Sequence, residues 1–235
     1  MTTNNQKEKN TLLKYYLNDD RFEVGIDEAG RGPMFGRVYS AAVILPKDDS
    51  FNHSLMKDSK KFHSTKKLRE TAEYIKSNAL YWSVSYEDEK VIDKINIRQA
   101  NFKSIHSNIL NITNKLKIDN VDLKNIFLLV DGNDFKPYTY FDNSTINYIP
   151  YECITGGDNL YTSIAAASIL AKVARDEYID DLCERNEYLK TYYDIDKNKG
   201  YGTKKHLDGI KEYGITEWHR KTYGICKTMH MSNFK

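Results

Sequence analysis

The chain has 235 residues, of which 40% are hydrophobic and 29% are charged, and its formal net charge is +2. This length suits one large α/β domain or a domain with a small appendage, and the composition is that of a soluble globular protein. Three scattered cysteines exclude a disulfide framework, and no stretch approaches the ~18 apolar residues of a membrane span. The polar start, "MTTNNQKEKN", lacks the apolar core of a signal peptide, so we expect an intracellular, cytoplasmic protein.

The basic residues are clustered although the net charge is small. Residues 57–69 carry six basic residues and one acid, and residues 197–227 carry eight basic residues and three acids, so each segment has a charge of +5. Two basic patches on a nearly neutral chain indicate contact with nucleic acid. Two solvated helix faces are the alternative interpretation.

Hydrophobic patterning predicts alternating elements in the first part of the chain. Residues 1–20 are expected to be a flexible lead-in. Short apolar runs predict strands at 22–26 and 38–45, which could pair as a hairpin. A Ser/Thr cap signal followed by apolar residues at helical spacing predicts a helix at 64–79. The alternating stretch 80–87 is typical of a half-buried strand.

The second part of the chain is predicted to hold three helices and one central strand. Residues 96–117 form an amphipathic helical pattern, and the continuous apolar run 126–130 is typical of a strand covered on both faces. A long helix is predicted at 159–186, where the small residues of "IAAASILAKV" would permit close packing on the sheet. A final helix is predicted at 204–214. Strands followed by long helices and further strands favour an α/β layer fold with a helical C-terminal extension.

Acidic side chains stand at the ends of two predicted strands. Asp27 and Glu28 end the first strand, Asp131 ends the 126–130 strand, and Asp158 lies at the start of the following helix. Sites in α/β sheets form at the carboxyl ends of strands, so these acids converge if the two strands are neighbours. Four carboxylates with no histidine or cysteine partner suit Mg²⁺ or Mn²⁺. Two such ions about 3.5–4 Å apart would support in-line attack on a phosphodiester.

Each acid also has a purely structural interpretation. Asp27 and Glu28 could form an exposed turn, and Asp131 followed by Gly132 is a common turn dipeptide. Asp158 could be a helix N-cap, since Asp is favoured there. A cap and a metal ligand are compatible roles, because one carboxylate oxygen can cap while the other binds an ion.

Six blocks of the sequence resemble, in their order, type II ribonuclease H (ribonuclease HII). They are "GIDEAGRGPMFGRVYSAAVIL", "KDSKKF", "INIRQA", "LLVDGN", "GGDNLYTSIAAASILAKVARD" and "NKGYGTKKHLDGIKEYGITEWHR". The resemblance covers about residues 22–224. It implies a ribonuclease H-like mixed five-stranded sheet flanked by helices. It also implies a catalytic domain at 21–190 and a helical, substrate-binding C-terminal extension at 191–235.

The resemblance also assigns roles to individual residues. It implies that Asp27, Glu28, Asp131 and Asp158 are catalytic and hold two Mg²⁺ or Mn²⁺ ions. It implies that Gly30, Arg31 and Gly32 recognise a ribonucleotide, that Tyr201 packs on its ribose, and that Lys60 holds a backbone phosphate. A backbone without side chains can approach a sugar closely enough to bind its 2′-hydroxyl.

The chain departs from the family pattern at two positions. The family usually has proline where this chain has Arg37, and lysine where it has Gly156. The first change is expected to alter a loop near the site, and the second removes a positive charge beside the acids. Lys172 and Arg175, within the predicted helix at 159–186, are expected to serve structure.

The implied activity is that of an endoribonuclease. It would cleave the RNA strand of RNA–DNA hybrids and cut 5′ of ribonucleotides embedded in duplex DNA by two-metal-ion hydrolysis, leaving 3′-hydroxyl and 5′-phosphate ends. A catalytically weak nucleic-acid-binding protein and a DNA-cutting nuclease on the same fold are the alternatives. The four acids disfavour the first, and the "GRG" and "KGYGT" elements disfavour the second. Residues 227–235 show no sliding-clamp motif, so we expect a monomer without a clamp partner.

Overall fold

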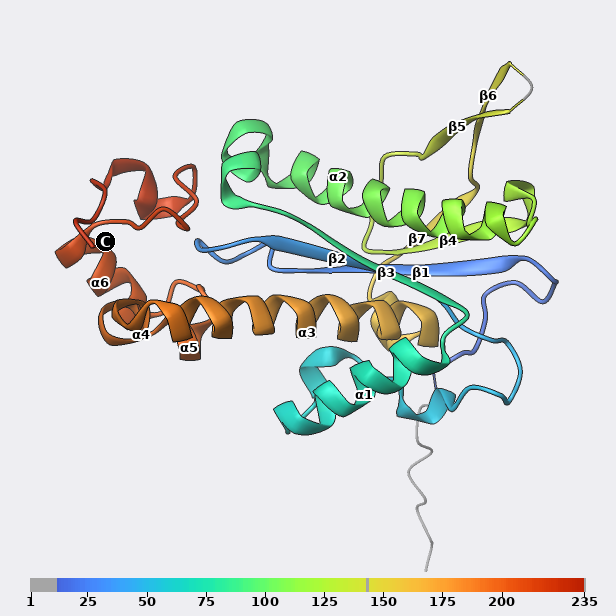
Figure 1. The fold of residues 1–235 in the computed structure, drawn as a ribbon, viewed down its shortest axis with the longest axis horizontal. Helices are drawn as coiled ribbons and strands as arrows, with labels where there is room; N and C mark the ends of the chain where they lie inside the picture. Colours follow the sequence, from blue (N-terminus) through green and yellow to red (C-terminus); the bar gives the residue numbers. More distant parts are fainter. Residues whose placement is uncertain (1–11, 143, 235) are drawn as a thin grey trace, which may run out of the picture.

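A mixed five-stranded sheet forms the centre of the structure, a computed structural model that describes residues 12–142 and 144–234 (Figure 1). Its strands are β1 (Phe22–Ala29), β2 (Val38–Ile44), β3 (Tyr81–Glu87), β4 (Ile126–Asp131) and β7 (Tyr151–Ile154). Their order across the sheet is β3-β2-β1-β4-β7. β1 pairs antiparallel with β2 and parallel with β4, which confirms both the predicted hairpin and the predicted mixed sheet.

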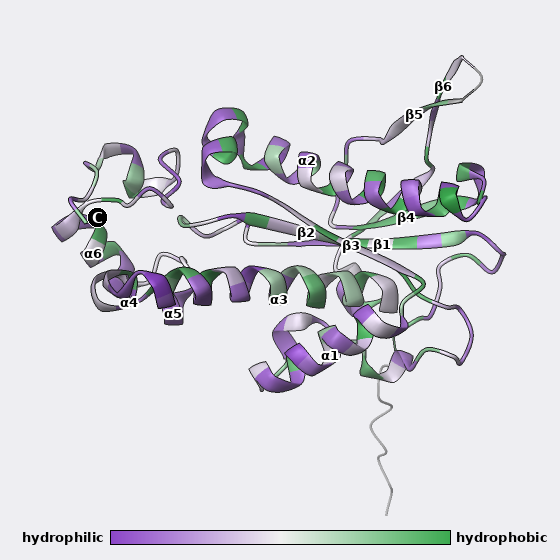
Figure 2. Cartoon of the chain, in the orientation of Figure 1, coloured by the Kyte–Doolittle hydropathy of each residue, from purple (hydrophilic) through white to green (hydrophobic). Residues whose placement is uncertain are grey.

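Long helices cover the two faces of the sheet. α2 (Glu89–Ile118) lies on one face, and α3 (Thr162–Arg185) lies on the other with α1 (Thr65–Asn78) beneath it (Figure 1). Figure 2 shows hydrophilic residues along much of α1. The buried residues of this helix are Leu68, Ala72 and Ile75. Apolar side chains of β1, β2 and β4 form one core with α2. Ala41 and Val43 of β2 form another with α1 and α3.

β1 and α3 approach each other unusually closely. A Cβ atom placed on Gly25 would lie 2.2 Å from the backbone carbonyl carbon of Ser163, so a side chain cannot be accommodated there. Ala165, Ala166 and Ala167 on α3 are fully buried, in agreement with the predicted close packing of this helix. The contact fixes β1 against α3 just before its acidic end.

α2 begins seven residues before the predicted helix at 96–117. Asn96 interrupts it with a positive φ of 66° and accepts a hydrogen bond from the backbone N–H of Gln99 through its side chain (3.1 Å). Asn96 therefore acts as the cap of the predicted helix, and residues 89–95 form a separate short turn of helix before it.

The C-terminal part of the chain holds α4 (Glu187–Tyr193), α5 (Ile195–Asn198), α6 (Lys204–Tyr213) and a 3-10 helix, Gly224–Thr228. It shares a hydrophobic core with the end of α3 and with Met34 and Phe35 from the β1–β2 connection. The predicted boundary between residues 190 and 191 falls inside α4. Within the described residues, no helix has both the length and the apolar character needed to cross a membrane.

The predicted lead-in at 1–20 lies partly outside the described residues, which begin at 12. Residues 12–20 contact the body of the protein. The N–H of Leu13 donates to the carbonyl of Leu160 (2.8 Å), and the Tyr16 ring stacks on Phe127 with centroids 5.8 Å apart.

A small hairpin that the sequence did not predict stands away from the body (Figure 1). Its strands are β5 (Thr139–Asp142) and β6 (Thr145–Tyr148), and they form a sheet of their own. Phe141 pairs opposite Ile146, and both side chains are more than half exposed. The hairpin lies between β4 and β7, which pair directly with each other in the main sheet.

Candidate active site

The register of β1 and β4 brings the predicted acids together. Ile26 pairs with Val130 in the parallel ladder, so Asp27 and Asp131, the residues that follow them, end neighbouring strands side by side. Asp27 is only 6% exposed, and its Oδ1 accepts the backbone N–H of Glu28 at 2.7 Å. The predicted convergence of these strand ends is therefore confirmed, and an isolated surface turn is excluded for Asp27.

The acids repel one another at this sheet edge. Burial raises the pKa of Asp27 well above its usual range, and the charges of Glu28 and Asp131 raise it further. Burial also raises the pKa of Asp131, together with the charge of Glu28, although the Gly157 N–H opposes this by donating to Asp131 Oδ1 at 2.7 Å. Such crowding of buried carboxylates is unfavourable until a cation neutralises it.

Asp158 reaches the same edge from a short 3-10 helix, Gly157–Asn159. It is 4% exposed, and its pKa is raised by burial and by the charges of Asp58 and Asp131. The N-cap of α3 is Tyr161, not Asp158, so the capping alternative for that helix is wrong. Capping of α3 therefore does not explain why Asp158 is buried.

Lys60 extends toward the acids from the loop before α1. Its Nζ lies 4.0 Å from Asp158 Oδ2, and its side chain is 81% exposed. Burial lowers its pKa, but neighbouring carboxylates outweigh that effect and raise it overall. The carboxylates belong to Asp58, Asp158, Asp27 and Asp131. Lys60 thus directs a positive charge at the Asp158 side of this acidic cluster.

Glu28 is held from two sides. Arg31 Nη1 donates to Glu28 Oε1 at 3.2 Å, and Asn101 Nδ2 donates to Glu28 Oε2 at 3.2 Å. Asn101 is buried on α2, and its Oδ1 has no hydrogen-bond partner. The four residues Glu28, Arg31, Asn101 and Asp131 line one small cleft. Sequence reasoning missed Asn101, because only its place just after the "INIRQA" block pointed to it.

The donor set fits a hard divalent cation. The side chains that would bind the ion all supply carboxylate oxygens, which Mg²⁺ and Mn²⁺ prefer. They are Asp27, Glu28, Asp131 and Asp158. Within the described ranges, no three His, Cys, Asp or Glu side chains form a closed metal-binding group.

The glycine–arginine–glycine segment lies against Tyr201, about 170 residues further along the chain. A Cβ placed on Gly32 would lie 3.5 Å from Tyr201 Cε1. Gly30 has a positive φ of 94°, and a Cβ there would lie 2.3 Å from Arg175 Nε, so only glycine fits. Tyr201 is 51% exposed. The structure thus brings the predicted ribonucleotide-recognition residues together beside the acids.

Arg220 holds this segment in place, and the sequence analysis gave it no role. Its guanidinium is fully buried and donates to four backbone carbonyls. They belong to Gly30 (2.6 Å), Pro33 (2.7 Å), Gly36 (2.9 Å) and Arg31 (3.0 Å). Burial lowers the pKa of Arg220 to about 10, so it remains charged at neutral pH. Its only sequence signal was its position at the end of the "EWHR" block.

Arg175 has the structural role expected for it. It is almost fully buried on α3, and its Nη2 donates to the carbonyls of Phe35 (3.3 Å) and Lys199 (2.8 Å). It therefore ties the β1–β2 connection to the segment that carries Tyr201.

The two departures from the family pattern have different surroundings. The Arg37 guanidinium lies over the rings of Tyr86 (4.0 Å) and Tyr178 (4.3 Å), so it is fixed by cation–π contacts. Gly156 has a positive φ of 68°, and no atom lies within 4 Å of the place where a side chain would start. The space beside the acids is therefore open at Gly156.

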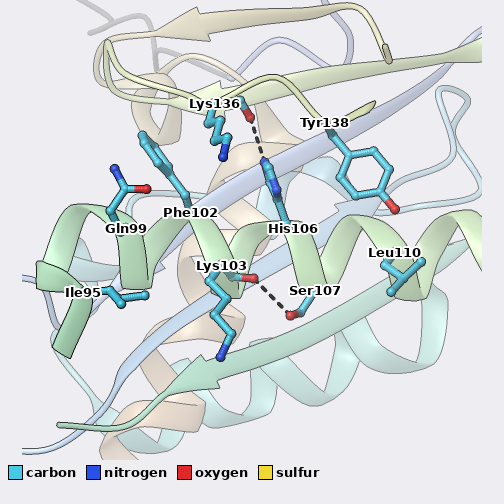
Figure 3. A pocket seen from close by; sticks show the side chains of 9 residues that line it. All are labelled: Ile95, Gln99, Phe102, Lys103, His106, Ser107, Leu110, Lys136 and Tyr138. Carbon is cyan, nitrogen blue, oxygen red and sulfur yellow. Dashed lines mark hydrogen bonds between the residues drawn. The ribbon is translucent and has the colours of Figure 1, made fainter. Parts of the chain in front are cut away.

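A larger cavity, of about 510 Å³, lies elsewhere, between α2 and residues 136–138 (Figure 3). None of the predicted site residues lines it. Beside it, His106 Nε2 donates to the carbonyl of Lys136 at 2.7 Å, which ties the segment after β4 to α2 (Figure 3). This cavity is a separate feature from the acidic sheet edge.

Comparison with known proteins gives a consistent result. The family model for ribonuclease HII matches residues 24–228. A ribonuclease HII of Bacteroides thetaiotaomicron is 43% identical over 214 residues, which cover 91% of this chain and 95% of that protein.

Solved structures share the fold. The ribonuclease HII in a complex with PCNA from Archaeoglobus fulgidus matches with a TM-score of 0.61 and 22% identity, over 87% of this chain and 96% of that one. The structure of Bst-RNase HIII in complex with Mn²⁺ matches with a TM-score of 0.59 and 14% identity, over 82% and 70% of the two chains. The chain therefore belongs to the ribonuclease HII family and is a type II ribonuclease H, an enzyme that acts on phosphodiesters.

Proposed function

We propose that this enzyme cleaves the RNA strand of RNA–DNA hybrids and cuts on the 5′ side of a ribonucleotide embedded in duplex DNA. The products would carry a 3′-hydroxyl and a 5′-phosphate. The observation that carries the proposal is the position of Gly32 against Tyr201, at the same end of β1 as Asp27 and Glu28. A surface suited to a ribose thus lies next to a cluster suited to a phosphodiester reaction.

Asp27, Glu28, Asp131 and Asp158 would hold the divalent cations, Mg²⁺ or Mn²⁺, two to a site. When bound, such ions activate a water molecule and stabilise charge on the phosphate. The raised pKa of Asp27, Asp131 and Asp158 supports this assignment, because a cation would relieve the repulsion that contributes to each shift. The Mn²⁺ complex of the related Bst-RNase HIII supports the class of metal.

The remaining residues of the site would prepare it for the ions and the substrate. Arg31 and Asn101 orient the two carboxylate oxygens of Glu28. Lys60 reduces the net negative charge near Asp158 and is placed to contact a backbone phosphate. Arg31 is half exposed, so its guanidinium can also reach a phosphate.

Selectivity for ribonucleotides would come from the backbone of Gly30–Gly32 and from Tyr201. Glycine lets the backbone N–H groups approach a 2′-hydroxyl, and the exposed Tyr201 ring offers a packing face for the sugar. A site built around a hydroxyl strongly rejects the analogue that lacks it, because its own polar groups stay unpaired. The basic segments 57–69 and 197–227 would hold the duplex, with residues 191–235 as the substrate-binding extension and 21–190 as the catalytic domain.

Three labelled duplexes test this function, each in Mg²⁺ and in Mn²⁺. One contains a single ribonucleotide, one a run of ribonucleotides, and one only DNA. We expect cleavage of the first two, with the cut of the first on the 5′ side of the ribonucleotide, and an inert all-DNA duplex. Comparable cleavage of all three duplexes would contradict the ribose-reading role and favour a DNA-cutting nuclease.

Monomeric state, cytoplasmic location and independence from a sliding clamp stay predictions from the sequence. The Archaeoglobus fulgidus relative was solved as a complex with PCNA. Size-exclusion chromatography of this protein with and without a sliding clamp tests the clamp prediction, and we expect two separate peaks.

A further inference from the structure

Two buried histidines connect Tyr201 to the segment that follows α6. His206 lies on α6, and His219 lies in the segment after it; both side chains are fully buried. The Nε2 atoms of the two rings are 3.0 Å apart. His206 Nδ1 lies 2.9 Å from the backbone carbonyl oxygen of Tyr201, and His219 Nδ1 lies 2.9 Å from the backbone N of Thr216.

The partners at the two ends determine the position of every proton in this chain. A carbonyl oxygen only accepts, so His206 Nδ1 must carry a proton and donate it to Tyr201. The Thr216 backbone N–H only donates, so His219 Nδ1 is its acceptor. The Thr216 hydroxyl oxygen lies 2.8 Å from the same Nδ1, and a hydroxyl can donate to it as well. One proton then remains for the contact between the rings, and it belongs to His219 Nε2, which donates to His206 Nε2. Both imidazoles are therefore neutral, with opposite tautomers.

We propose that His206 and His219 are positioning residues, whose directed hydrogen-bond chain holds the Tyr201 backbone so that its ring stands against Gly32. The inference rests on the proposed function, because it concerns the ribose-reading role of Tyr201. Neither histidine touches the acidic cluster or the exposed face of Tyr201. Each acts through another group.

The position of His219 in the chain strengthens this inference. His219 forms a β-bridge with Phe35, and the next residue, Arg220, donates to the carbonyls of Gly30 and Arg31. One dipeptide therefore secures both sides of the surface: the glycine segment through Arg220, and Tyr201 through the histidine pair. A displacement of about 1 Å between groups of an active site can cost about a hundredfold in rate.

The surroundings keep the pair neutral. The Tyr193 ring lies 5.4 Å from the His219 ring, but its hydroxyl donates to the carbonyl of Gly214 at 3.0 Å and does not bond to either imidazole. Phe35 packs edge-on against both rings. Burial lowers the pKa of both histidines, and the charge of His206 lowers the pKa of His219 further.

A matched pair of variants at His206 separates positioning from packing. His206→Asn places an amide N–H where Nδ1–H lies and keeps the bond to Tyr201, but it has no atom at the Nε2 position, so it tests the bond to Tyr201 apart from the contact with His219. His206→Gln extends its amide to the position of Nε2 and loses that bond. On the single-ribonucleotide duplex, we expect His206→Gln to lower kcat by about tenfold or more, and His206→Asn to stay within about threefold of the wild type.

His206→Gln in a Tyr201→Ala background tests whether the loss of kcat depends on the Tyr201 ring. We expect His206→Gln to cause no further loss there, since the ring that it positions is already absent. Equal losses for both His206 variants, or the same loss with and without the Tyr201 ring, would reduce the pair to a packing role. A wild type that cuts no ribonucleotide-containing duplex would overturn the proposed function instead.

A spectroscopic measurement tests the chain without any activity. Long-range ¹H–¹⁵N correlation spectra of the labelled wild type should show His206 as the Nδ1–H tautomer and His219 as the Nε2–H tautomer at neutral pH. His206→Asn and His219→Gln assign the two signals by their disappearance. A charged ring, or His206 as the Nε2–H tautomer, would overturn the proposal even in an active enzyme.

Discussion

The guanidinium of Arg220 donates to the backbone carbonyl of Gly30 at 2.6 Å, although the two residues are 190 positions apart in the sequence. The contact makes the shape of the glycine–arginine–glycine segment depend on the C-terminal extension. The two glycines have no side chains that could fix the segment by packing. Arg220 supplies the fixed hydrogen bonds that the segment lacks.

Arg220→Lys should therefore be strongly destabilising. Lysine cannot serve four carbonyls arranged around a planar guanidinium, and each buried group left without a partner costs about 1–3 kcal/mol. We expect the free energy of unfolding to fall by about 3 kcal/mol or more in chemical denaturation. Arg69→Lys is the control, because Arg69 forms exposed ion pairs, which are worth at most about 1 kcal/mol. Equal effects of the two variants would contradict the role given to Arg220.

Asp27→Asn should nearly abolish cleavage and leave the metal-free fold at least as stable as the wild type. The pKa of Asp27 is raised by burial and by the charges of Glu28 and Asp131, so its neutral replacement removes a repulsion. We expect an equal or higher melting temperature without divalent ions. The loss of turnover should exceed about a hundredfold, which the loss of an outer-shell partner can already cause. Asp131→Asn should behave alike, and wild-type turnover in either variant would exclude that acid from the metal site.

Asp158→Asn distinguishes a ligand from a structural acid. Asp158 does not cap α3, and its Oδ1 accepts a hydrogen bond from the neighbouring Asn159 side chain at 2.8 Å. Because Asn has nearly the same shape, we expect a change of less than about 1 kcal/mol in the free energy of unfolding. Turnover should nevertheless fall strongly. Melting temperature and single-turnover rate, measured on the same sample, distinguish a metal ligand from a structural residue. Near-normal turnover would make Asp158 a structural residue.

Tyr201→Phe and Tyr201→Ala separate the two contributions of this side chain. Phe keeps the ring that faces Gly32 and loses only the hydroxyl, whereas Ala loses both. On the single-ribonucleotide duplex, we expect Ala to lose far more activity than Phe. Both variants should still bind the duplex, with affinity falling as salt concentration rises, because the basic segments are intact. If the two variants lose equal activity, the ring has no packing role.

The histidine pair predicts a pH dependence of stability. The folded-state pKa of His219 lies below its usual value near 6.5, because burial and His206 disfavour the charge. The unfolded chain therefore binds more protons below pH 6.5, and stability falls as pH decreases through that value. We expect His219 to contribute a slope of up to about 1.4 kcal/mol per pH unit. His219→Gln, measured in denaturant at several pH values, should show a shallower slope than the wild type; identical slopes would contradict a buried neutral His219.

The sequence predicted most of the sheet and its acidic edge for a physical reason. Strands that are covered on both faces, such as 126–130, are continuous apolar runs, and an acid at the end of such a run is conspicuous. Parallel neighbours then bring Asp27 and Asp131 to the same place, as the register confirms. The predicted start of the helix at residue 96 falls on the interruption at Asn96, whereas α2 itself begins at Glu89.

The features that escaped prediction depend on contacts between distant segments. The bond from Asn101 to Glu28 joins α2 to β1, and no local pattern marks one asparagine among the many of this chain. The same holds for Arg220 and for the facing rings of His206 and His219. The β5–β6 hairpin escaped for another reason: β6 is exposed along most of its four residues, so it carries no buried alternating pattern.

The β5–β6 hairpin is a suitable place to attach a label or a tether to the enzyme. β4 and β7 are parallel neighbours in the sheet, so the connection that carries the hairpin runs from the end of β4 back to the start of β7. The strands β5 and β6 stand away from the main sheet (Figure 1). A fluorophore, an affinity tag or a surface tether inserted into this hairpin would leave the sheet register unchanged. A single molecule could then be immobilised through the hairpin.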